Sequence, residues 1–305
     1  MTVTAAAIAE LRTLRDFLRY AISRFEGAGL VYGHGTTNAL DEAAFIILES
    51  LHLPIDNLDP FLDARLLQDE RRKLAELIEA RVTSRKPASY LLGRAYVKGI
   101  PFYVDERVIV PRSFIGELLF TDLFNGGSDA LIEDPEAVEN VLDLCTGSGC
   151  LAILAAKVFG NAHVDAVDLS KDALDVARRN VKESGDADRI TLYQGDLFGP
   201  LGRQRYDLII TNPPYVGEAV MSGLPPEYAH EPKLALAGGP DGLDIVRQIL
   251  AAAPKHLTPE GGVICEIGED REILEAEYPQ LQFMWLDTED SAGEVFWLPA
   301  AAFDD

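Results

Sequence analysis

The 305-residue sequence is poor in cysteine and lacks long apolar runs. Its cysteines, Cys145, Cys150 and Cys265, are odd in number and none belongs to a Cys-x-x-Cys pair. We therefore expect reduced thiols and no metal site, which is typical of a cytoplasmic protein. No stretch approaches the roughly 18 apolar residues of a membrane-spanning helix. The N-terminus also lacks the apolar core of a secretory signal, so neither membrane attachment nor export is expected.

Basic residues are scarce as well. Lys and Arg number 27 against 50 Asp and Glu, which gives a formal net charge of −23. Nucleic-acid binding depends largely on Lys and Arg at the phosphates, so this balance argues against a nucleic-acid substrate. It favours a basic protein partner, because opposite charges raise encounter rates. An acidic proteome or a demand for solubility would produce the same charge.

Apolar residues spaced by three and four predict helices in the first part of the chain. The pattern covers Ile8–Phe25, and further helices are expected over residues 41–51 and 63–83. Residues 88–110 change to short β-branched and aromatic runs separated by turn residues, which predicts a β-hairpin. We therefore predict a helical substrate-recognition domain over residues 1–87 and a hairpin linker over 88–110.

The third predicted domain, residues 111–305, alternates strand and helix patterns. A helix over 113–124 is followed by predicted strands at 141–144, 163–167, 190–193, 206–211, 262–267, 283–286 and 295–298. Helical patterns separate them at 151–159, 172–184, 243–256 and 272–278. Such alternation predicts an α/β fold with a doubly wound, mostly parallel seven-stranded sheet covered by helices on both faces.

A glycine-rich turn follows the first of these strands. It runs from Asp143 through Cys145, Thr146, Gly147, Ser148 and Gly149 into the next helix. Glycines let a ligand approach the backbone closely, and a helix N-terminus favours a polar or anionic group. Any tight strand-to-helix turn can hold two glycines, so this turn alone does not establish a ligand site.

Two acids end the next strands. Asp168 follows the second strand and precedes Leu169, and Asp196 follows the third and precedes Leu197. An acid after the second strand of a doubly wound fold accepts hydrogen bonds from a ribose. Asp196 can accept from an adenine amino group while an apolar neighbour packs on the ring. Each acid alone is more often a helix N-cap, but together with the glycine-rich turn they converge on one crevice. The missing full G-x-G-x-x-G pattern favours a single nucleoside over a nicotinamide dinucleotide.

The peptide Asn212-Pro213-Pro214-Tyr215 follows the fourth strand. Two consecutive prolines restrict the backbone and donate no N–H groups. An amide nitrogen is a poor nucleophile that gains positive charge when it attacks a methyl sulfonium. The Asn212 side-chain oxygen and the Pro213 carbonyl can hold its N–H groups and stabilise that charge, while the Tyr215 ring packs on the planar amide. The loop therefore indicates methylation of an amide or amino-purine nitrogen.

At these residues the sequence resembles the class I S-adenosylmethionine methyltransferases and, within them, the HemK-like protein-glutamine N5-methyltransferases. The resemblance extends from about residue 85 to the C-terminus and includes segments 104–112 and 239–243. It implies S-adenosylmethionine as methyl donor, S-adenosylhomocysteine as product and Asn212, Pro213, Pro214 and Tyr215 around the glutamine. The residues implied at the cofactor are Asp143, Cys145, Thr146, Gly147, Ser148, Gly149, Asp168, Leu169, Asp196, Leu197 and Asn212.

Two branches of that family differ in substrate, one methylating peptide-chain release factors and the other large-subunit ribosomal protein number three. Release-factor enzymes usually have Pro-Arg-Pro-Glu-Thr-Glu after the hairpin, whereas residues 111–117 read Pro-Arg-Ser-Phe-Ile-Gly-Glu. This difference favours the ribosomal branch. Arg112, Glu117 and Glu231 lie in segments similar to family active-site walls or form ion pairs, and His230 is expected to be a substrate-side or structural residue.

Three functions remain open at this point. The first is glutamine methylation of the ribosomal protein, with the release factor as the alternative substrate. The second is adenine N6-methylation of a nucleic acid, which uses the same loop but disagrees with the net charge of −23. The third is a non-enzymatic, cofactor-binding assembly factor, against which the intact Asn212–Tyr215 loop argues.

Overall fold

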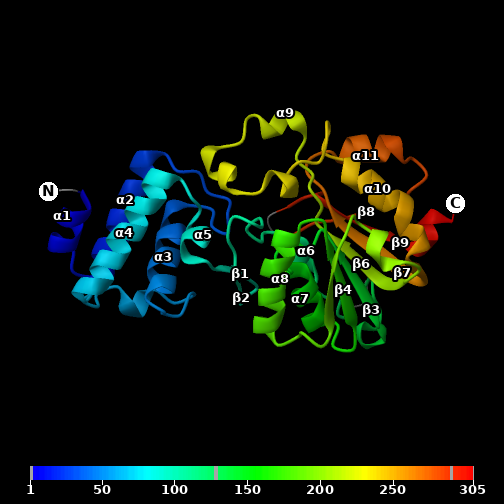
Figure 1. Cartoon of the computed structure of the whole chain (residues 1–305), viewed down its shortest axis with the longest axis horizontal. Coiled ribbons are helices and arrows are strands. Elements are labelled where there is room, and N and C mark those ends of the chain that lie inside the picture. Colours follow the sequence, from blue (N-terminus) through cyan, green and yellow to red (C-terminus); the bar gives the residue numbers. More distant parts are fainter. Residues whose placement is uncertain (1–2, 127–129, 289–290, 305) are drawn as a thin grey trace. The chain divides into compact units, whose positions relative to one another are not determined.

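A computed structural model describes residues 3–126, 130–288 and 291–304 (Figure 1). The chain divides into two compact units. One comprises the chain up to Ala95 together with Pro225–His230, and the other comprises Tyr96–Leu224 and the chain from Glu231 onward. None of the helices in the described ranges has the length and apolarity that a membrane span requires.

The first unit is helical. Its α-helices are α1 (Val3–Glu10), α2 (Leu14–Ala28), α3 (Ala39–Ser50), α4 (Gln68–Ser84) and α5 (Ala88–Leu92). Helix α2 begins at Thr13, whose hydroxyl accepts from the Asp16 backbone N–H, and ends at Gly29 with φ of 58°. Phe17 and Phe25 of α2 are fully buried in the apolar core of this unit. The predicted periodicity of residues 8–25 therefore produces two helices, α1 and α2, because Thr13 caps a new start.

A buried charge cluster completes the helical unit. Arg81 of α4 is fully buried, and its Nε lies 2.5 Å from Oε1 of Glu42 in α3. Its Nη1 lies 3.6 Å from Oε1 of Glu227, which also accepts the Val31 backbone N–H at 3.1 Å. Segment 225–230 thus joins the helical unit through a charged side chain, although it follows the Asn212–Tyr215 loop in sequence.

Residues 88–126 are less regular than predicted. A short helix, α5, precedes the hairpin, whose strands β1 (Ala95–Val97) and β2 (Ile100–Phe102) have three residues each. The helix predicted over 113–124 is reduced to α6 (Ile115–Leu118). Thr121 donates from its backbone N–H and its hydroxyl to the Leu118 carbonyl, and such local bonds replace the next helical turn.

The second unit contains the predicted seven-stranded sheet. The strands are β3 (Asn140–Leu144), β4 (His163–Asp168), β5 (Ile190–Gln194), β6 (Tyr206–Thr211), β7 (Leu257–Glu266), β8 (Met284–Leu286) and β9 (Val295–Pro299). Their order is β5-β4-β3-β6-β7-β9-β8, and only β9 pairs in antiparallel fashion with β7 and β8. The fold class predicted from the sequence is confirmed.

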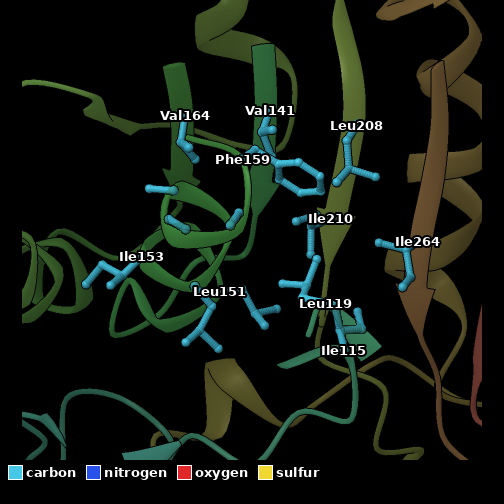
Figure 2. Close-up of a cluster of buried hydrophobic side chains, with 14 of the residues drawn as sticks. Ile115, Leu119, Val141, Leu151, Ile153, Phe159, Val164, Leu208, Ile210 and Ile264 are labelled. Atoms are coloured by element: carbon cyan, nitrogen blue, oxygen red, sulfur yellow. The ribbon is translucent and has the colours of Figure 1, made fainter. Parts of the chain in front are cut away.

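Helices cover both faces of this sheet (Figure 1). They are α7 (Cys150–Val158), α8 (Lys171–Ser184), α10 (Asp244–Ala252) and α11 (Arg271–Glu277). Helix α9 (Glu218–Met221) is a short helix without buried residues. Leu208 and Ile210 of β6 face one apolar cluster with α7, whereas Ile209 faces a second cluster with α10. Figure 2 shows the first cluster, in which Val141 of β3 and Leu208 and Ile210 of β6 gather with side chains of α7. Burial on both faces explains the continuous apolar runs of the strands.

Replacing Arg81 with Met tests the charge cluster. The variant leaves the buried Glu42 carboxylate without its guanidinium partner, which typically costs about 3–5 kcal/mol. We expect the helical unit of the variant to unfold at a clearly lower midpoint urea concentration than that of the wild type. Arg15→Met removes an exposed pair with Asp63 and serves as control, with an unchanged midpoint expected. Equal midpoints for both variants would contradict the importance of the buried cluster.

Candidate active site

Strand register gathers polar residues at one edge of the sheet. Leu144 of β3 aligns with Val167 of β4 and with Thr211 of β6, and Thr211 aligns with Cys265 of β7. Cys145, Asp168, Asn212 and Glu266 are therefore next in register at the carboxyl ends of neighbouring parallel strands. Ligands of open α/β sheets bind outside this edge.

The glycine-rich turn is held from beneath by Asp143. Its carboxylate accepts the Thr146 hydroxyl at 2.6 Å and the Ala152 backbone N–H at 3.0 Å. Asp143 is fully buried, and burial raises the pKa of its carboxyl group to about 7. Gly149, with φ of 78°, begins α7, and a Cβ there would lie 3.2 Å from Ala177 Cβ. Asp143 thus fixes the turn by hydrogen bonds, and Gly149 allows its close packing against α8.

Asp168 joins the end of β4 to the same turn. One carboxylate oxygen accepts the Gly147 N–H at 2.8 Å, and the other accepts the Ser170 N–H at 2.8 Å. Burial raises the pKa of this carboxyl group. Cys145 and Leu197 adopt positive φ, 59° and 45°, which is uncommon for residues other than glycine and is found at functional turns.

A cavity of about 150 Å³ lies at this edge. The predicted residues that line it are Cys145, Gly147, Asp168, Leu169, Asp196, Leu197, Asn212 and Pro214. Carboxylates that can accept from hydroxyl and amino groups stand beside apolar walls from Val108, Ile109 and Ile245. This donor set fits a nucleoside, with its polar sugar and flat apolar ring.

A second, smaller cavity of about 50 Å³ adjoins the first. Arg112, Ser113, Thr146 and Ser148 contribute its polar lining, and Cys145, Gly147 and Asn212 line both cavities. Asn212 therefore stands where the two cavities share a wall. Of the predicted site residues, all of which are described, Asp143, Gly149, Pro213 and Tyr215 line neither cavity.

The Asn212–Tyr215 loop is supported from both sides. The Thr211 hydroxyl donates to the Leu144 carbonyl at 3.1 Å and ties β6 to β3. Behind the loop, Val216 pairs with Ala237 in a parallel bridge. A Cβ on Gly238 would lie 2.7 Å from the Pro214 carbonyl oxygen, so only glycine permits this close approach.

Glu266 is a site residue that the sequence analysis missed. It ends β7, is 1% exposed and accepts three hydrogen bonds, from Ser113 Oγ at 2.6 Å, Phe114 N at 2.9 Å and Tyr215 OH at 3.0 Å. Burial raises the pKa of the Glu266 carboxyl group to about 7 and also raises the pKa of Tyr215. An acid at the carboxyl end of a buried strand, as in Asp168, was the available signal.

Ion pairs and hydrogen bonds hold the remaining candidate residues, Arg112, Glu231, Glu117 and His230. Arg112 donates from both terminal nitrogens to the buried Glu231 carboxylate, at 2.6 and 2.8 Å. The two side chains thus form a bidentate ion pair beside the second cavity. Glu117 lies 4.0 Å from Lys98 and is partly exposed. His230 belongs to the helical unit, where its Nε2 lies 2.9 Å from the Ser84 carbonyl.

Comparisons with known proteins identify the domain and its fold. The family model "Methyltransferase small domain" matches residues 121–223. The catalytic domain of hMettl16 in complex with MAT2A 3'UTR hairpin 6 covers 74% of this chain and 80% of its own, at 13% identity and a TM-score of 0.50, which shows the fold alone.

Proteins named ribosomal protein uL3 glutamine methyltransferase are far more similar. The protein of Bradyrhizobium diazoefficiens is 60% identical over 97% of this chain and 93% of its own length. That of Bordetella pertussis is 56% identical over 95% of both chains, and that of Neisseria meningitidis serogroup B is 53% identical over 96% and 94%. The chain belongs to the family of ribosomal protein uL3 glutamine methyltransferases.

Proposed function

We propose that the protein transfers a methyl group from S-adenosylmethionine to the side-chain amide nitrogen, N5, of a glutamine in ribosomal protein uL3. The observation that supports this most strongly is the position of Asn212. It begins an Asn-Pro-Pro-Tyr loop and lines both the cavity whose lining fits a nucleoside and its smaller neighbour. Relatives of 53–60% identity carry the corresponding name.

The first cavity would hold the cofactor. Asp168 and Asp196 would accept hydrogen bonds from the ribose and the adenine, and Leu169 and Leu197 would contact the ring. Thr146 and Ser148 of the second cavity add hydroxyl groups for the amino-acid end. When bound, S-adenosylmethionine supplies an electrophilic methyl group on a sulfonium, and its product is S-adenosylhomocysteine.

The Asn212–Tyr215 loop would act on the glutamine. The Asn212 side-chain oxygen and the Pro213 carbonyl would accept the amide N–H groups and stabilise the charge that develops on nitrogen. Proline at 213 and 214 offers no competing N–H groups. The Tyr215 ring would pack on the planar amide, with alignment supplying much of the rate.

The acidic charge suits a basic ribosomal substrate. Residues 96–305 hold 37 of the 50 Asp and Glu but 15 of the 27 Lys and Arg, so they carry −22 of the net −23. This negative charge attracts a basic protein and repels nucleic acid, which is also negatively charged. We propose further that residues 1–87 form a domain that recognises the substrate and that residues 88–110 link it to the methyltransferase domain. The protein would act in the cytoplasm.

Methyl transfer to three purified candidates tests this function. Radiolabelled S-adenosylmethionine is offered with uL3, with release factor and with duplex DNA, side by side. We expect label in uL3 above either alternative. Preferential label in release factor or DNA would reassign the substrate, and no transfer to any of them would leave only a non-enzymatic assembly role.

Asn212→Ala tests the catalytic loop. Losing the side-chain acceptor should lower kcat for uL3 by at least about 10²-fold, because removal of one preorganised group at a developing charge has such effects. Circular dichroism should show an unchanged fold. Asn161→Ala is the matched control, since Asn161 is exposed and donates to the Glu136 carbonyl. Undiminished activity of Asn212→Ala would disprove the mechanism.

Gly238→Ala tests the support behind the loop. The new methyl group would lie 2.5 Å from the Gly242 carbonyl oxygen, 2.7 Å from the Pro214 carbonyl oxygen and 2.8 Å from Tyr215 Cα, so the backbone around the loop must shift. A displacement of about 1 Å can cost 10²-fold, and we expect kcat to fall accordingly. Gly223→Ala is the control, because its Cβ would meet no atom nearer than 3.7 Å. Equal rates for both variants would argue against this support.

A further inference from the structure

The Glu266 carboxylate connects two segments of the active site. Tyr215 belongs to the catalytic loop, whereas Ser113 and Phe114 follow Arg112 in the segment that lines the second cavity. All three groups donate to Glu266, two to Oε2 and one to Oε1. An ionised carboxylate accepts only, so all three donors are satisfied at once by the charged form.

This carboxylate is costly to bury. Glu266 is 1% exposed, and no Lys or Arg among the described residues lies within ion-pair distance of it. The guanidinium of Arg112 is directed at Glu231 instead. A buried charge held mainly by hydrogen bonds contributes little net stability, since an apolar side chain of similar size avoids the desolvation cost. Its location next to Asn212 in the register points to a role in the reaction.

We infer that Glu266 is a positioning residue for methyl transfer, which orients the Tyr215 ring toward the substrate amide through its hydrogen bond with the phenol. The inference rests on the proposed function. Tyr215 is the loop residue that would pack on the glutamine amide, and its hydroxyl donates to Oε1 of Glu266 at 3.0 Å. Gly268, whose Cβ would lie 3.3 Å from the ring, leaves space for that ring position.

Protonation of Glu266 would disturb this arrangement. Its pKa of about 7 places the loss of the proton near neutral pH, and the charged form prevails at higher pH. A protonated oxygen donates and can no longer accept as the carboxylate does. Other groups that act on this network are Arg112, which lowers the pKa of Glu266 and of Tyr215, and Glu294 and Cys265 nearby. Glu266→Gln is a permanent analogue of the protonated form.

Steady-state kinetics against pH form the first test, at saturating cofactor because Asp143 also has a pKa of about 7 beneath the cofactor turn. For the wild type we expect kcat to rise as pH increases through 7. Glu266→Gln should lose that rise and, at pH 8, have a kcat lower by about 10- to 100-fold with an unchanged KM for S-adenosylmethionine. The exposed Glu269→Gln is the control. Wild-type kcat and pH profile in Glu266→Gln would overturn the inference.

A double-mutant cycle with Tyr215→Phe identifies the route of the effect. If Glu266 acts through the phenol, adding Glu266→Gln to Tyr215→Phe should lower kcat by no more than about twofold. An undiminished loss in that background would overturn the inference, because Glu266 would then act by another route. Thermal unfolding of every variant verifies that it is folded.

NMR of ring-labelled tyrosine provides a readout that needs no turnover. The Tyr215 signal, assigned by its disappearance in Tyr215→Phe, should shift with a midpoint near pH 7 in the wild type and stay constant in Glu266→Gln. A signal independent of pH in the wild type would overturn the inference. Failure of the wild type to methylate any of the three substrates would instead refute the proposed function, while NMR still decides on Glu266.

Discussion

The parallel alignment of β3, β4, β6 and β7 is the constraint on which the active site depends. It brings chain segments more than 100 residues apart in sequence to one edge, where Asp168 and Glu266 end their strands and Asn212 follows β6 directly. Apolar clusters on both faces of the sheet maintain that alignment. Because the strands are buried on both sides, the edge is where polar side chains can project into a cavity without breaking the core.

Backbone groups around this edge are held by buried carboxylates. Asp143 holds the glycine-rich turn, and Glu266 holds the start of α6 and the Tyr215 hydroxyl. Each accepts hydrogen bonds that offset part of the cost of burying a carboxylate, and each has a pKa raised to about 7 by that burial. Such groups cluster at functional sites, because precise placement of reacting atoms requires rigid neighbours.

Local patterns predicted the sheet and its carboxyl edge, since strand and helix periodicity and the residues that end each strand are read directly along the chain. Asp168, Asp196 and Asn212 accordingly lie around one cavity. Long-range contacts were not predictable in this way. Burial of Glu227 against Arg81 and the hydrogen bonds of Glu266 depend on residues distant in sequence. The cofactor and substrate roles of the individual residues stay predictions.

The most direct test of this account is tandem mass spectrometry of uL3 after reaction with S-adenosylmethionine. The central claim is that the edge around Asn212 activates a planar amide nitrogen rather than a basic amine. The account predicts a single methyl group on the side-chain amide nitrogen of one glutamine. A methyl group on lysine, arginine or a terminal amine would contradict it.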